Sequence, residues 1–298
     1  MSVSFAVPGR LLAAWSANRG AIALSNRDGN TALSRLKEAL VHDSENSRTY
    51  YLLGIAYVAQ GDAYAAQAAL FHSVGLQPTD RLARLQLAEL YLRNGQIALA
   101  LEQRWKATQG LPARARARMA GSLCPGRVAA CVSEFDRLLT LPDLSDADRR
   151  VIYREALDGL ATIRSRRDTE RYAREAVELF PQEAYFHWQL ANALLFDQPE
   201  EALREAHVVE ELGYEPAATY ELFGKIYRQM GRWEQAIEAF EQSLEFNSNN
   251  AWVRFWLGGA YWKVGRQADA IREWQATLRI APGFEEAQQA LESAGAQP

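Results

Sequence analysis

The chain has 298 residues, of which 48% are hydrophobic and 23% are charged, so it is long and apolar enough to bury a sizeable core. Its formal net charge is −4, which argues against a general attraction to nucleic acid or to an anionic membrane surface. No run of about eighteen apolar residues occurs, so we expect no direct membrane insertion. The start lacks a basic segment ahead of an apolar core, which predicts a cytoplasmic protein. The alternative is a soluble domain of a membrane-anchored or exported protein.

A helix–turn–helix pattern recurs along the chain with a period of 34 residues. In chain order the predicted repeats are 13–46, 47–80, 81–114, 115–149, 150–183, 184–216, 217–250 and 251–284. The fourth is degenerate: its first helix is short and ends at Cys124-Pro125-Gly126. It finishes in a predicted loop or hinge, Leu141–Ser145, with a helix N-cap at Ser145 or Asp146. Residues 285–294 form a short helix with a polar face, suited to capping the open end.

The repeat 217–250 shows the pattern most clearly, and two others match it well, 47–80 and 251–284. In 217–250 the aromatic, small and turn residues stand at fixed spacings: Tyr220, Phe223, Gly224 and Tyr227 on the first helix, Gly231 in the turn, and Ala236, Phe240 and Ser243 on the second helix. Glycine or alanine at the eighth position lets the two helices approach closely, and the aromatic residues fill the space around it. The hairpin cannot cover its own apolar faces, so neighbouring hairpins must stack.

The spacing and residue types resemble the tetratricopeptide (TPR) repeat. The resemblance implies an all-α fold, a right-handed α-solenoid of about eight repeats with a C-terminal capping helix, forming a single domain over 1–298. It also implies a non-enzymatic scaffold that binds a protein or peptide partner.

No constellation of residues indicates catalysis. The four histidines are not spaced as metal ligands, and neither a phosphate-binding loop nor a nucleophile elbow is present. We therefore expect no catalytic residue, no cofactor and no metal. Two cysteines, Cys124 and Cys131, leave two interpretations open: a disulfide in an oxidising compartment, or two small buried apolar residues. The lack of any sign of export favours the second.

In the TPR family, positions 2, 5, 9, 12 and 13 of the first helices line a concave groove. The resemblance therefore implies a groove lined by Tyr51, Ile55, Leu85, Glu89, Trp188, Asn192, Glu221, Lys225, Arg228, Trp252, Phe255 and Trp262. Exposed apolar area of this kind is typical of a contact surface. For Trp188, Trp252 and Trp262, groove lining and core filling both remain open, whereas core filling is favoured for Trp256 and Trp274. The lysine and asparagine pattern with which some TPR domains clamp a terminal carboxylate is absent.

Charge is distributed unevenly along the chain. Residues 81–174 contain 18 basic and 11 acidic residues, and residues 175–250 contain 4 basic and 15 acidic residues. Such blocks favour an alternative function, in which the chain is a structural or regulatory arm of a larger complex, such as a membrane-associated bacterial envelope assembly, and acts through charge patches or self-association. Nucleic-acid binding is not expected, because the basic block lacks interleaved aromatic residues.

Overall fold

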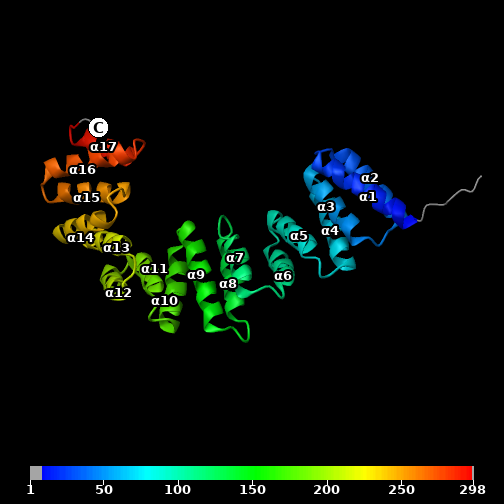
Figure 1. Ribbon diagram of the computed structural model, residues 1–298, viewed down its shortest axis with the longest axis horizontal. Coiled ribbons are helices and arrows are strands. Elements are labelled where there is room, and N and C mark those ends of the chain that lie inside the picture. The colour runs from blue at the N-terminus through cyan, green and yellow to red at the C-terminus, as the bar shows by residue number, and fades with distance from the viewer. Residues whose placement is uncertain (1–8, 297–298) are drawn as a thin grey trace, which may run out of the picture. The chain divides into compact units, whose positions relative to one another are not determined.

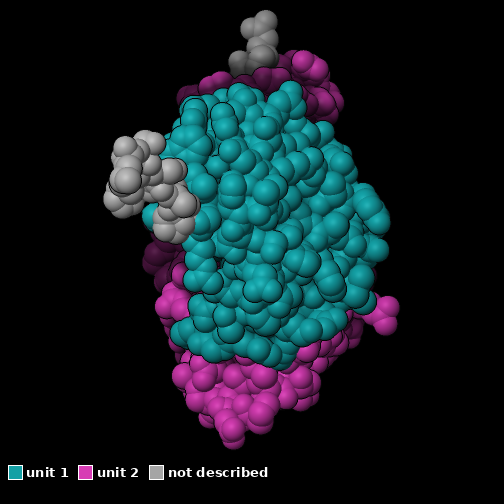
Figure 2. Space-filling model, turned by 90° about the vertical axis from the view of Figure 1, so that its right-hand side faces the viewer, with its two compact units in different colours: residues 1–112 teal, residues 113–298 magenta. Residues whose placement is uncertain are grey.

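The computed structural model describes residues 9–296 and is all-α, with seventeen helices and no strand in that range (Figure 1). The chain divides into two compact units, Met1–Pro112 (unit 1) and Ala113–Pro298 (unit 2), which Figure 2 colours separately. Unit 1 contains α1 (Gly9–Ser25), α2 (Gly29–His42), α3 (Ser47–Gln60), α4 (Ala63–Leu76), α5 (Arg81–Arg93) and α6 (Ile97–Thr108). Unit 2 contains α7 (Ala113–Gly121), α8 (Val128–Leu139), α9 (Asp146–Thr162), α10 (Arg166–Leu179), α11 (Ala184–Leu194), α12 (Pro199–Glu211), α13 (Pro216–Gln229), α14 (Trp233–Phe246), α15 (Ala251–Lys263), α16 (Gln267–Ile280) and α17 (Glu285–Ser293).

Consecutive helices pair within each unit, as a TPR solenoid requires. The close approach predicted at the eighth position of the repeats is confirmed: a Cβ added at Gly54 would lie 2.6 Å from Leu70 Cγ, and one at Gly224 would lie 2.4 Å from Phe240 Cδ1. Both glycines face the large residue of the second helix, so neither site has room for a side chain.

The helix boundaries follow from local sequence signals. Asp28, Asn46, Asp62, Asp80 and Asn250 precede their helices, and each side chain accepts a hydrogen bond from a backbone N–H in the first turn. The turn inside the hairpin uses a left-handed residue at the fifteenth position, where the φ values of Gly61, Gly95, Gly231 and Gly265 lie between 72° and 81°.

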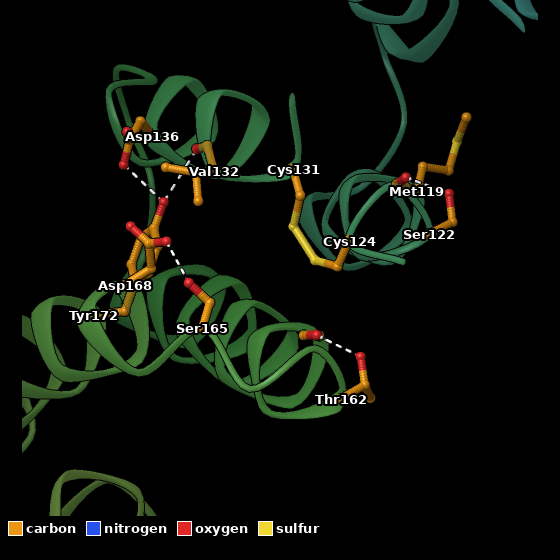
Figure 3. Close-up of a disulfide and its surroundings, with 11 residues drawn as sticks. Met119, Ser122, Cys124, Cys131, Val132, Asp136, Thr162, Ser165, Asp168 and Tyr172 are labelled. Atoms are coloured by element: carbon orange, nitrogen blue, oxygen red, sulfur yellow. Dashed lines mark hydrogen bonds between the residues drawn. A yellow bond between two sulfur atoms is a disulfide. The ribbon is translucent and has the colours of Figure 1, made fainter. Parts of the chain in front are cut away.

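The degenerate fourth repeat contains a disulfide, Cys124–Cys131 (Figure 3). Both cysteines are fully buried, and the bond joins the turn after α7 to the first turn of α8. The favoured expectation of two unlinked cysteines is therefore wrong, and the alternative of a disulfide is what the structure contains. Nearby, the Tyr172 hydroxyl donates to Asp136 Oδ1 (2.7 Å) and approaches the Val132 carbonyl oxygen (3.1 Å), tying α10 to α8.

The short first helix of this repeat, α7, ends at Gly121, and α7 packs more extensively against α9 than against its partner α8. The predicted N-cap at Ser145 is confirmed: its hydroxyl accepts from the Asp148 N–H at 3.1 Å. The division between the two units falls at Pro112–Ala113, upstream of the predicted hinge at Leu141–Ser145.

At the C-terminal end, α17 covers the last hairpin. Leu291 is fully buried in a cluster with Tyr261, Trp274 and Leu257, and Ala287 is also fully buried. The helix keeps Glu285 and Glu286 exposed, so its polar face lies toward solvent as the sequence predicts.

Candidate functional site

All twelve residues predicted to line a groove lie on first helices of their hairpins. Unit 1 carries four of them: Tyr51 and Ile55 on α3, and Leu85 and Glu89 on α5. All four are partly buried, and Glu89 forms an ion pair along its own helix with Arg93 (3.2 Å). Burial, with the nearby charge of Asp80, raises the pKa of Tyr51 above its ordinary value. The other eight residues belong to unit 2, on α11, α13 and α15.

In unit 2 the structure joins three of the predicted residues through one ammonium group. Lys225 Nζ donates to Asn192 Oδ1 on α11 (3.1 Å) and to Glu221 Oε1 on α13 (3.3 Å). Glu221 also accepts from Asn250 Nδ2 at the start of α15 (3.1 Å), and Asn192 donates to the Trp188 carbonyl oxygen (2.8 Å). We call Asn192, Lys225, Glu221 and Asn250 the polar chain. The polar chain links three successive hairpins. Within it, the Glu221 carboxylate accepts hydrogen bonds from Lys225 and Asn250.

A pocket opens beside the polar chain, between α13 and α15. Its walls are two cationic side chains, an amide, three aromatic rings and a glycine: Arg228, Gln229, Trp233, Phe255, Trp256, Gly259 and Lys263. We call it the α13–α15 pocket. No carboxylate lines it. The Arg228 guanidinium lies 5.5 Å from the Trp256 ring centre, and Lys225 Nζ approaches the same ring at 5.9 Å. The Trp256 ring therefore makes cation–π contacts with both Arg228 and Lys225.

Trp256 packs against the core of the last hairpins, as the sequence predicts, but it also faces the pocket. It packs on Phe240, 6.0 Å between ring centres, but it is only partly buried and its ring forms a wall of the pocket. The helical spacing could not show this, because position 6 lies at the edge between the core and the groove face. The expectation for Trp274 is confirmed, since that ring is buried in the last hairpin. Trp233, Gly259 and Lys263 also line the pocket without having been in the predicted set.

The three tryptophans left open by the sequence have different environments. Trp252 is 49% exposed and touches Phe284 and Phe255 at its edges. Trp262 packs against Trp274, 5.7 Å between ring centres, and contributes to the core at that end. Trp188 is partly buried beside Tyr214, and its indole Nε1 is buried without a hydrogen-bond partner in the described part of the chain. Trp252 is thus the exposed aromatic of this set.

Neither a metal site nor a spanning helix emerges from the described residues. Between residues 9 and 296, no group of three or more His, Cys, Asp or Glu side chains is placed to hold a metal ion. No helix in that range is both long and apolar enough to cross a membrane.

Two family models match the sequence, one described as "Tetratricopeptide repeat" over residues 47–80 and one as "TPR repeat" over residues 224–265. The chain therefore contains tetratricopeptide repeats. The first match coincides with a predicted repeat, and the second runs from Gly224 to Gly265, the close-approach glycine of one hairpin and the turn glycine of the next. TPR repeats are generally protein–protein interaction modules, and TPR scaffold proteins are typically non-enzymatic.

Among solved structures, this TPR chain is similar to a tetratricopeptide repeat protein from Parabacteroides merdae ATCC 43184, at 16% identity and a TM-score of 0.39, covering 84% of this chain and 99% of that one. A chain of the APC/C hetero-tetramer Cut9-Hcn1 is also 16% identical, with a TM-score of 0.42 over 92% of this chain but only 48% of that one. The TPR domain of P58(IPK), again 16% identical, gives a TM-score of 0.32. A comparison with curated proteins gives no match.

Proposed function

We propose that this TPR chain is a non-enzymatic scaffold that holds a peptide or helix of a partner protein on the first-helix face of unit 2. One observation carries the proposal: Trp252 leaves half its surface exposed directly beside a pocket with two cations and aromatic walls. Tryptophan is costly to expose, and it contributes binding energy with little loss of side-chain entropy. The partly buried unit 1 residues, Tyr51 and Leu85 among them, provide a second candidate face.

The test compares Trp252→Ala with Phe246→Ala in a pull-down from the source cell's lysate. Phe246 is a matched control, because it is an equally exposed aromatic, stacked on Tyr220, but it lies on the second helix α14. We expect Trp252→Ala to lose at least about tenfold of the captured partner, as for a hot-spot residue, while Phe246→Ala retains it. Equal capture by wild type and both variants would contradict the proposal. Trp262 is unsuited to this test, because its loss would also disturb the core around Trp274.

The compartment is part of the proposal. The sequence predicts the cytoplasm, but the Cys124–Cys131 disulfide supports the alternative of a soluble domain in an oxidising compartment, where such bonds persist. The partner would then be a protein of the same compartment.

A second candidate function is self-association, and the exposed face of α1 favours it. Interior repeats bury the third and tenth residues of the first helix, as Thr49 and Ala56 are buried in α3. The corresponding residues of α1, Trp15 and Ile22, are 52% and 60% exposed. A second copy of the chain could cover this apolar face.

Sedimentation at low and high salt separates the mechanisms of self-association. A dimer through the α1 face should persist in high salt and dissociate in Trp15→Ser/Ile22→Ser, because its contact is apolar. A dimer through the charge blocks should dissociate with salt in wild type and variant alike. A monomer under every condition would contradict self-association.

A further inference from the structure

Arg228 is a cation without a counter-ion inside the protein. Its guanidinium is partly buried, and within the described residues it has no hydrogen-bond or ion-pair partner; its neighbour is the Trp256 ring. Burial lowers the pKa of this guanidinium, which shows that the site stabilises the charge less well than water does. A desolvated charge without a partner is unfavourable, so an anion arriving at this position would gain more than at an exposed arginine.

The rest of the α13–α15 pocket adds to this preference. Lys263 reaches across from α15, and its Nζ lies 5.9 Å from the Trp233 ring, with no carboxylate partner in residues 9–296. The acidic side chain that α13 carries, Glu221, is already bound by Lys225 and Asn250. The pocket thus presents two uncompensated cations, and its own helices supply no carboxylate to neutralise them.

The positive charge of the pocket contrasts with the acidic sequence around it. Residues 175–250 are strongly acidic, with 15 acidic and 4 basic residues, yet α14 carries its carboxylates Glu234, Glu238, Glu241 and Glu245 exposed outside the pocket. Two of the four basic residues of this stretch, Lys225 and Arg228, lie at the pocket or on the ring that forms its wall. The cations are therefore concentrated on the first-helix face of an otherwise acidic region.

The aromatic walls of the pocket restrict which groups of a ligand can lie next to its anionic group. Phe255, Trp256 and Trp233 form the walls, and a Cβ added at Gly259 would have no heavy atom within 4 Å, so the space beside the helix is open. A ligand that places a carboxylate at Arg228 and Lys263 would bring its adjacent groups onto aromatic rings. Aromatic faces favour planar or apolar side chains, and the exposed Trp252 lies one turn before Phe255, against whose ring it packs edge-on.

We propose that the α13–α15 pocket recognises an acidic side chain, Asp or Glu, in a partner peptide whose neighbouring residue is aromatic or apolar. The guanidinium of Arg228 binds the carboxylate, Lys263 adds to the charge, and the neighbouring residue packs on Phe255 and Trp252. This inference rests on the proposed function and names the peptide class that the same face selects.

The experiment is a selection of random peptides displayed on phage, with the intact chain as bait, followed by titration of the selected peptide made synthetically with an amidated C-terminus. We expect enriched sequences to carry Asp or Glu beside an aromatic residue. Changing that acidic residue to its amide should weaken binding to the wild-type chain by about tenfold or more, the range for a hydrogen bond to a charged group. The Arg228→Gln variant should bind both peptides with nearly equal affinity.

Two further variants define the site. Arg232→Gln removes an exposed arginine that directly precedes α14 and does not line the pocket. This variant should leave the preference for the acidic peptide unchanged. Gly259→Leu places a side chain in the pocket, starting from a Cβ that meets no heavy atom within 4 Å, and should abolish binding of the peptide while helicity is retained by circular dichroism. Unchanged affinity in Gly259→Leu would place the peptide elsewhere and overturn the inference.

The outcomes separate this inference from the proposed function. Enriched peptides that bind through Trp252 without a preference for an acidic residue would overturn the inference and leave the scaffold proposal standing. A requirement for a free C-terminal carboxylate would overturn it as well. Failure to enrich any peptide would contradict both.

Discussion

Three largely buried side chains fix the loop that precedes the first helix of their hairpins. Each stands at the fourth residue of its repeat: Arg84, His187 and Arg254. Each contacts the carbonyl oxygen found three residues before its repeat, that of Pro78 (2.6 Å), Pro181 (3.0 Å) or Ser248 (3.0 Å). Each also contacts a side chain of the second helix, that of Gln103 (2.6 Å), Glu205 (2.6 Å) or Glu273 (2.8 Å). Three other repeats place tyrosine here, Tyr50, Tyr153 and Tyr220, so in these six repeats the fourth position either packs an aromatic ring or fixes the preceding loop.

His187 makes this fastening dependent on pH. A carbonyl oxygen only accepts, and an ionised Glu205 carboxylate also only accepts, so both contacts are hydrogen bonds when both ring nitrogens donate, as they do in the protonated imidazole. Burial opposes the charge, but the bonds to Glu205 and to the Pro181 carbonyl outweigh it and raise the pKa of His187 above its usual 6.5. A folded pKa above the unfolded one stabilises the fold fully below about pH 6.5 and loses that stabilisation as the pH rises through the folded pKa.

We therefore expect the free energy of unfolding to fall as the pH rises above about 6.5, measured by urea denaturation. Glu205→Gln should flatten this dependence, because the neutral amide no longer favours the imidazolium. His207→Gln is the matched control, since His207 is an exposed histidine. An unchanged slope in Glu205→Gln would show that His187 is neutral in the folded chain.

The adjacent glycines of α15 provide a second prediction at this scale. A Cβ at Gly258 would lie 2.5 Å from Trp274 Nε1 and 3.1 Å from the Ala270 carbonyl oxygen, and Trp274 is held by its bond to the Phe255 carbonyl oxygen (3.2 Å). Gly258→Ala should therefore destabilise the chain by about 1–3 kcal/mol through overpacking. Gly259→Ala meets nothing within 4 Å and should stabilise by up to about 1 kcal/mol through helix propensity. Equal effects in urea denaturation would contradict the close approach.

At the scale of helices and turns, the sequence predicts the glycines that a left-handed turn or a close helix–helix contact requires. The turn glycines and the close-approach glycines obey steric rules that no neighbour can change. Arg27 and Arg164 occupy the same turn position with φ values of 59° and 55°, and no local signal distinguishes them from ordinary exposed arginines. Their conformation is imposed by the two helices that the turn must join.

The candidate site was predictable in its helices and less so in its residues. Positions on a first helix follow from the repeat, so Arg228 and Phe255 were expected on the groove face and do line the pocket. Trp256 and Lys263 line it as well. The side chains of Lys225 and Arg228 reach from α13 to the Trp256 ring on α15. Such contacts between neighbouring hairpins depend on rotamers and on inter-helix spacing, which the repeat period does not specify.

The α7–α8 hairpin depends on a covalent link that the other hairpins lack. The Cys124–Cys131 bond closes a loop over a separation of seven residues, and it should contribute roughly 2 kcal/mol by restricting the unfolded chain. We expect a reductant to lower the urea midpoint of the wild-type chain and to leave that of Cys124→Ala/Cys131→Ala unaffected. Titration of thiols in the unfolded, unreduced protein provides the control, since two reactive thiols per chain would contradict the bond.

For the whole molecule, the division at Pro112–Ala113 separates two sets of candidate residues that the family resemblance places on one groove. In a repeat protein, stability is approximately a sum of repeat and nearest-neighbour terms, so a unit with its own packed interior should retain its fold without the other. Unit 2 contains the polar chain, the α13–α15 pocket and the capping helix α17, and the residues that line or contact them lie within it.

We therefore expect residues 113–298, produced alone, to unfold cooperatively and to bind a peptide selected on the full chain with an affinity within about threefold of the full chain's. A fragment starting at 128 should lose more stability because α7 packs on α9. Circular dichroism, thermal unfolding and titration of the same peptide measure this. Affinity restored only by the full chain would show that the unit 1 residues Tyr51, Ile55, Leu85 and Glu89 contact the same ligand.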